Sequence, residues 1–228
     1  MPLLILGALL AILAYLPAVW VRRVMKQHGA EIEGLAGTGG ELAKHLIKRF
    51  ELSDIEVEET GPFQDHFDPA ARKVRLSPDN FHGKSLTAVA VAAHEVGHAM
   101  QFHRSEKIFE LRKRYLPTAA RLSKAGIGLL MVLPVVGFAV RSPIVVGGII
   151  AASLLLQLAG ALAYLIILPE EWDASFNKAM PVLIEGDYVD EKQIPAVRKI
   201  LKAAALTYFA SALANMLNIG RWFMILRR

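Results

Sequence analysis

The chain separates its charged residues sharply from its apolar ones, and this constrains the fold more than any other feature. Four windows contain no Asp, Glu, Lys or Arg: residues 1–21, 125–140, 142–169 and 203–220. A helix needs about 20 apolar residues to cross a bilayer. The first and third windows meet that length. The second does so if it begins near Ala119, with the basic heads of Arg121 and Lys124 reaching the interface.

The fourth window is interrupted by Asn215, Asn218 and Gly220, so it reaches that length only by continuing to about residue 226. The sequence therefore predicts about four transmembrane helices, at 1–21, 119–140, 143–169 and 203–226, with the last either crossing the membrane or lying in its interface. Two polar segments remain, 22–118 and 170–202. Basic residues follow the first window, so the positive-inside rule places the N-terminus outside and both polar segments in the cytoplasm.

Composition narrows the chemistry that these segments can carry. The 228 residues include no cysteine, which excludes disulfides, cysteine-bound zinc, thiol nucleophiles and iron–sulfur clusters. Any metal must be held by histidines and carboxylates. The net charge of +5 is explained by Lys and Arg beside the apolar helices, so we expect a lipid bilayer as partner and no nucleic acid.

The first polar segment holds all seven histidines and has the pattern of a mixed α and β domain. Thr38 and Glu41 have the spacing of a capping box, which predicts a helix from there to about Phe50. Residues 55–58 alternate like a strand, and 63–67 and 72–76 flank a turn at Asp68–Pro69. Because 72–76 is short and charged, it is predicted to be an edge strand. Residues 85–102 are predicted to form a helix.

The sequence His94-Glu95-Val96-Gly97-His98 is an H-E-x-x-H motif on that helix. Two histidines four residues apart lie on one helix face, one turn from each other, and their imidazoles can bind one Zn²⁺. Glu95 lies beside them and can act as general base on a water bound to the metal. The pattern therefore predicts a zinc site in which Glu95 is catalytic and does not bind the metal.

A third protein ligand is required, and it could come from one of two arrangements. The third-histidine arrangement of metzincins fails, because Arg104 stands where the histidine would be and Gln101 where the glycine would be. His103 falls on the opposite helix face and is predicted to be a surface residue. The remaining arrangement uses a distant glutamate, for which Glu170 and Glu171 are the candidates at the end of the third apolar window.

Three blocks of sequence resemble a known family, the YugP-like bacterial membrane neutral zinc metallopeptidases. The blocks are Ala92 to Ala99 around HEVGH, Leu168-Pro169-x-Glu171-x-Asp173-Ala174-Ser175, and Asp65 to Pro69 running into Val74-x-Leu76-Ser77. The resemblance implies a mainly α, zincin-like metallopeptidase domain with a small β-sheet, anchored in the bacterial inner (plasma) membrane by several spans, with its active site facing the cytoplasm. It selects Glu171 as the third ligand, a gluzincin arrangement, and leaves Glu170 facing solvent or substrate.

The family is distantly similar to HtpX-like and CaaX-prenyl proteases, which use a glutamate in an E-x-x-x-D motif whose aspartate supports a histidine ligand. Here Ser175 occupies the position of that aspartate, so Asp173 or Asp187 is a candidate for the supporting role. The implied reaction is hydrolysis of a peptide or protein substrate, which would lie extended beside strand 72–76.

A side-chain donor is expected to stabilise the oxyanion; His66 is the first candidate, and Tyr115 and Tyr208 are weaker ones. Two alternatives to this endopeptidase are an intramembrane metalloprotease and a membrane scaffold that binds metal without catalysis. The first is disfavoured because none of the four predicted spans contains an aspartate. The second would leave Glu95 without a task.

Overall fold

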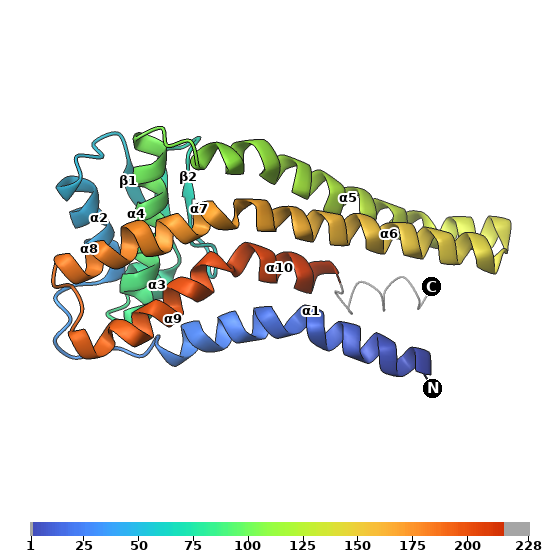
Figure 1. Cartoon of the computed structure of the whole chain (residues 1–228), viewed down its shortest axis with the longest axis horizontal. Helices are drawn as coiled ribbons and strands as arrows, with labels where there is room; N and C mark the ends of the chain where they lie inside the picture. Colours follow the sequence, from blue (N-terminus) through green and yellow to red (C-terminus); the bar gives the residue numbers. More distant parts are fainter. Residues whose placement is uncertain (1, 217–228) are drawn as a thin grey trace. The chain divides into compact units, whose positions relative to one another are not determined.

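A computed structural model describes residues 2–216 of the chain (Figure 1). The described part is mainly helical with one small sheet, as predicted. Its helices are α1 (Pro2–Gln27), α2 (Gly39–Arg49), α3 (Pro78–Phe81), α4 (Leu86–His103), α5 (Phe109–Val140), α6 (Pro143–Ala163), the 3₁₀ helix η1 (Tyr164–Ile167), α7 (Leu168–Trp172), the π-helix η2 (Asp173–Ala179), α8 (Met180–Glu185), the 3₁₀ helix η3 (Glu191–Gln193), α9 (Ile194–Ala205) and α10 (Thr207–Met216). These elements form two compact units: residues 20–110 with 168–206, and the remainder.

The sheet of the first of these units, which we call the polar unit, has the order β1 (Glu56–Glu59), β3 (Lys73–Leu76), β2 (His66–Asp68). Strand β3 is parallel to β1 and antiparallel to β2. The hairpin predicted around Asp68–Pro69 is thus confirmed, but the prediction that residues 72–76 form an edge strand is wrong, because β3 lies in the middle.

Charge pairing explains how a strand with two basic residues, Lys73 and Arg75, occupies the centre of the sheet. Arg75 binds Glu58 on β1 and Asp68 on β2, each at 2.6 Å, and Lys73 also binds Glu58 at 2.6 Å. The backbone N–H groups of Ala71 and Ala70, together with the charge of Arg75, hold the pKa of Asp68 below its ordinary value. One face of β3 is therefore a solvated ion-pair network.

The opposite face of the sheet packs on α4. Val74, Leu76 and Phe67 are buried there, and the Phe67 ring contacts those of Phe102 and Phe109. Helix α2 also packs against α4 and begins with the predicted capping box, in which Thr38 and Glu41 exchange hydrogen bonds of 2.8 and 3.1 Å. This packing fixes α4 from two sides.

Helix α4 is confirmed where the sequence predicted it. The Ser85 side chain accepts a hydrogen bond from the N–H of Ala88 and caps the helix. Every residue from Leu86 to Gln101 is buried. Because many of these residues are alanines, the π-helix η2 and helix α9 pack closely against α4 as well. The H-E-x-x-H motif consequently lies on a rigid element.

Helices α5 and α6 of the second unit form an antiparallel hairpin (Figure 1). Within the described residues, two helical stretches are long and apolar enough to cross a membrane, Phe109–Val140 and Pro143–Glu185. Only 17% and 22% of their most apolar windows are buried, which is unlike the core helix of a soluble protein.

The number of candidate spans is therefore two, and the prediction of about four is wrong for the described residues. Helix α1 contains residues 2–21 of the first predicted span but is not one of the two candidates. The predicted segment 203–226 is interrupted after α9, which ends at Ala205, and α10 begins at Thr207. Residues 217–226 lie outside the described part.

The hairpin carries its polar groups inside and its apolar groups outside. Ser153 and Gln157 are buried; the Ser153 hydroxyl donates to the carbonyl of Gly126 at 2.6 Å and accepts from the Gln157 amide at 3.1 Å. Large apolar side chains are exposed instead, among them Met131, Val135, Phe138, Ile144 and Leu155. Close packing through small and polar residues is typical of helices that face lipid.

Candidate metal centre

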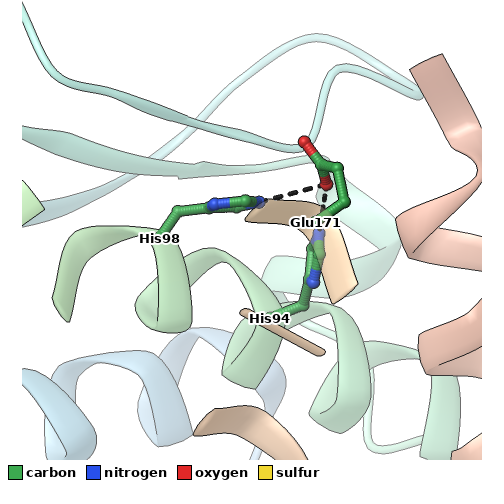
Figure 2. Close-up of side chains that lie close together, drawn as sticks. All are labelled: His94, His98 and Glu171. Atoms are coloured by element: carbon green, nitrogen blue, oxygen red, sulfur yellow. Dashed lines mark hydrogen bonds and ion pairs between the residues drawn. The ribbon is translucent and has the colours of Figure 1, made fainter. Parts of the chain in front are cut away.

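The two histidines of the motif point to the same place from successive turns of α4. Figure 2 shows His94 and His98 directed at the carboxylate of Glu171, which comes from α7. The Nε2 atoms of His94 and His98 lie 3.4 and 3.2 Å from Oε2 of Glu171. One ligand atom from each residue lies within 4.8 Å of the others, so the three could hold a metal ion. The structure thus brings together the three residues expected to bind zinc.

The cluster is buried in the polar unit. His94, His98 and Glu171 expose 3%, 1% and 1% of their surface. A carboxylate at that depth is costly unless a positive charge or hydrogen bonds compensate it. The surroundings of the two imidazoles therefore decide what this cluster can bind.

The π-helix η2 brings Ser175 against the first histidine. The Ser175 hydroxyl lies 3.0 Å from Nδ1 of His94 and donates to the carbonyl of Leu201 on α9 at 3.1 Å. Because its proton is used by that carbonyl, the hydroxyl accepts from Nδ1–H of His94. Ser175 thus supports His94 from the position where the similar proteases have an aspartate, four residues after Glu171.

The second histidine is supported by a side-chain amide that the sequence gave no reason to select. Nδ1 of His98 lies 2.9 Å from Oε1 of Gln101, and the Gln101 amide nitrogen donates to the carbonyl of Glu170 at 3.0 Å and to Asp173 at 2.9 Å. With both N–H groups used, the amide oxygen must accept from Nδ1–H of His98. Asp173 therefore supports His98 through Gln101, whereas Asp187 is exposed.

The prediction that Glu170 faces solvent or substrate is wrong. Glu170 is fully buried, and its Oε1 lies 3.2 Å from Nδ1 of His98. The helical twist of about 100° per residue keeps Glu170 out of the group formed with Glu171. Glu170 instead lies beside Nδ1 of His98, on the side of the imidazole away from Glu171.

These hydrogen bonds fix both neutral rings with the proton on Nδ1. The two Nε2 lone pairs and the Glu171 carboxylate then converge as three acceptors in a buried space. Such a set repels itself unless a proton or cation lies within it, and two imidazoles with one carboxylate are a donor set that suits Zn²⁺. The residues present therefore fit the metal that the sequence predicted.

The remaining predicted residues have different surroundings. Glu95 is 7% exposed, and no described side chain or backbone group bonds its carboxylate. His66 on β2 donates from Nδ1 to the carbonyl of Gln64 at 2.7 Å, so only its protonated ring could donate to an oxyanion from Nε2. Tyr115 and Tyr208 belong to the other unit. His103 is exposed and pairs with Asp54, as expected of a surface residue.

Comparison with known proteins agrees with this chemistry. Residues 3–227 match the family described as "Putative neutral zinc metallopeptidase". The chain belongs to this family, as its motifs predicted. It is 34% identical over 207 residues to the "Putative membrane protease YugP" of Bacillus subtilis (strain 168), across 86% of this chain and 84% of that protein. No solved structure matches it.

Proposed function

We propose that the protein is a membrane-bound, zinc-dependent endopeptidase of the gluzincin type. The observation that supports this most is the convergence of two Nε2 atoms and the Glu171 carboxylate, with both Nδ1 atoms already hydrogen-bonded. His94, His98 and Glu171 would hold the zinc ion. Zinc supplies a Lewis acid that polarises the scissile carbonyl and lowers the pKa of water.

Glu95 acts as general base in this scheme. It follows His94 on α4, retains a small exposed surface and has no partner among the described residues, so its carboxylate is available to a water molecule. The carboxylate takes a proton from the attacking water and passes it to the leaving amine. Ser175 and Gln101 keep the two imidazoles in place while this occurs. The zincin-like relationship of the domain is part of the same proposal.

The substrate is a peptide or protein that binds in an extended conformation. Because β3 is central, a peptide can add to the described sheet only at β1 or β2. Strand β2 packs with β3 on α4, the helix that carries the motif, whereas β1 contacts α2. We therefore assign the substrate to the free edge of β2, where His66 would contact it.

The membrane arrangement follows from the two candidate spans. We propose that α5 and α6 cross the bilayer as a hairpin, which makes the protein multi-pass. Two crossings return the chain to the side from which it left, as a site shared by His98 and Glu171 requires. Arg112, Lys113 and Arg114, at the start of α5, favour the cytoplasm for that side by the positive-inside rule.

The conversion of Glu95 to glutamine tests the catalytic proposal. Glu95→Gln should bind zinc in the same proportion as the native chain, because Glu95 is not a ligand. It should cleave casein at least about 10²-fold more slowly, because the base is lost. His103→Ala, an exposed change on the same helix, is the control and should retain full activity. A Glu95→Gln protein with undiminished cleavage would refute the role, and a native chain that holds zinc but cleaves nothing would favour a scaffold.

A further inference from the structure

We propose that Gln101 is a positioning residue that locks the two helices of the metal site together. The inference rests on the proposed function. Gln101 lies three residues after His98 on α4 and is fully buried. Its oxygen accepts from His98, while its nitrogen donates to the backbone carbonyl of Glu170 and to Asp173. One side chain thus contacts a proposed ligand on α4 and the residue next to a proposed ligand on α7.

Only an amide satisfies all three of these contacts. A glutamine has one acceptor oxygen and two N–H donors, and each is used here. A glutamate of the same shape would turn its second oxygen, which can only accept, toward both the Glu170 carbonyl and the Asp173 carboxylate. A methionine would fill the volume and make none of the bonds. The hydrogen bonds therefore require glutamine at position 101. Substitutions of similar size can test the effect of these bonds separately from the effect of side-chain volume.

The far end of this network is anchored by a buried lysine. Lys178, 8% exposed, binds Asp173 and lies 2.8 Å from Glu106, which follows α4 in the chain. Asn177 also donates to Asp173 at 2.8 Å. Asp173 is consequently held in one orientation by two donors of η2 and presents its remaining contact to Gln101. The hydrogen-bond network thus extends from Glu106 in the loop after α4, through Lys178 and Asp173 of η2, to Gln101 and His98.

The network orients the imidazole of His98, whereas Ser175 orients that of His94. The neutral hydroxyl of Ser175 is hydrogen-bonded to His94 and to the carbonyl of Leu201. The imidazole of His98 must be oriented separately, and Gln101 does this while it holds α7 at a fixed distance. We infer that loss of the amide weakens metal binding through misplacement of Nε2 of His98, without removal of any ligand.

The test measures zinc affinity by chelator competition on the full-length protein in detergent, together with the visible absorption spectrum of the Co²⁺ form. Gln101→Met should bind zinc about 10- to 100-fold more weakly, as is usual when the support of a metal ligand is lost, and its Co²⁺ spectrum should shift. The matched control is Gln157→Met, which removes a buried glutamine hydrogen bond from the other unit. It should leave both measurements unchanged.

A second pair of variants keeps the inference testable if Gln101→Met fails to fold. Gln101→Glu preserves the acceptor for His98 but places a second carboxylate against that of Asp173. The repulsion between the two carboxylates should also weaken zinc binding. Adding Asp173→Asn restores a donor between positions 101 and 173 and should recover part of the loss. Native zinc affinity in Gln101→Met, or a double variant no better than Gln101→Glu, would overturn the inference. A native chain without zinc would instead overturn the proposed function.

Discussion

A single methyl group at Gly97 should disturb the metal centre without touching any proposed ligand. A Cβ atom at this position would lie 2.7 Å from the carbonyl oxygen of Ala174, whereas ordinary contacts begin at 3.4 Å. The Cβ atom is bonded directly to the backbone and the Ala174 oxygen is part of it, so no side-chain rotation relieves the clash. Helix α4 and the π-helix η2 must separate by about 0.7 Å, the difference between these two distances, which is overpacking of the usual kind.

This separation should lengthen the hydrogen bond between Ser175 and His94, because Ser175 follows Ala174 directly in η2. If the whole displacement is added to the 3.0 Å contact between Ser175 and Nδ1 of His94, that contact lengthens to about 3.7 Å, beyond hydrogen-bond range. We expect Gly97→Ala to lose about 1–3 kcal/mol of stability and about 10- to 100-fold in zinc affinity.

Thermal unfolding and chelator competition measure the two effects. Gly128→Ala is the control, since a Cβ there has no atom within 4 Å and alanine favours a helix. It should leave zinc affinity unchanged. Native zinc affinity in Gly97→Ala would show that α4 and η2 do not set the geometry of the site, and would refute this reasoning.

Three further predictions concern the ligands and the membrane. Glu171→Ala should abolish stoichiometric zinc binding and cleavage together; retention of zinc, measured by metal analysis, would place the third ligand elsewhere. Ser175→Ala should weaken zinc binding about 10-fold or more with the ligands intact, as chelator competition will show, and an unchanged affinity would exclude its support of His94. Because the native chain has no cysteine, single cysteines can map topology: an impermeant reagent on intact cells should label position 142 and spare 107 and 192. Labelling at 107 would invert the arrangement.

Local sequence signals were sufficient for the elements that carry the motif. The capping box at Thr38 and Glu41 predicted the start of α2, and the apolar run before His94 predicted α4. Both signals depend on residues within one or two helical turns, so they do not depend on contacts with distant parts of the chain. The pairing of His94 and His98 with Glu171 needed more, namely the family resemblance, because 73 residues separate His98 from Glu171.

Strand order could not be predicted in the same way. The charges of Lys73 and Arg75 are typical of an exposed edge, yet they are neutralised by Glu58 and Asp68 on the two neighbouring strands. A strand with one solvated face can occupy the centre of a sheet if its neighbours supply opposite charges. Nothing in residues 72–76 alone distinguishes these cases, since the partners are up to 17 positions away.

The supports of the two histidines were missed for a related reason. In the sequence, Ser175 stands out only because it replaces an aspartate, and Gln101 only because it excludes a third-histidine site. Their roles depend on the π-helix, which brings Ser175 to His94, and on the burial of Glu170, whose carbonyl faces Gln101. These contacts join segments about 70 or more residues apart, so no local pattern reports them.

The position of the metal itself is the most direct test of the account. Crystals of the full-length protein grown with zinc should show one strong anomalous peak at the zinc absorption edge. We expect it within about 2.0–2.2 Å of Nε2 of His94, Nε2 of His98 and a carboxylate oxygen of Glu171, with Glu95 nearby but not bound. A peak that lacks Glu171 among its ligands, or zinc-saturated crystals with no peak between α4 and α7, would contradict the account.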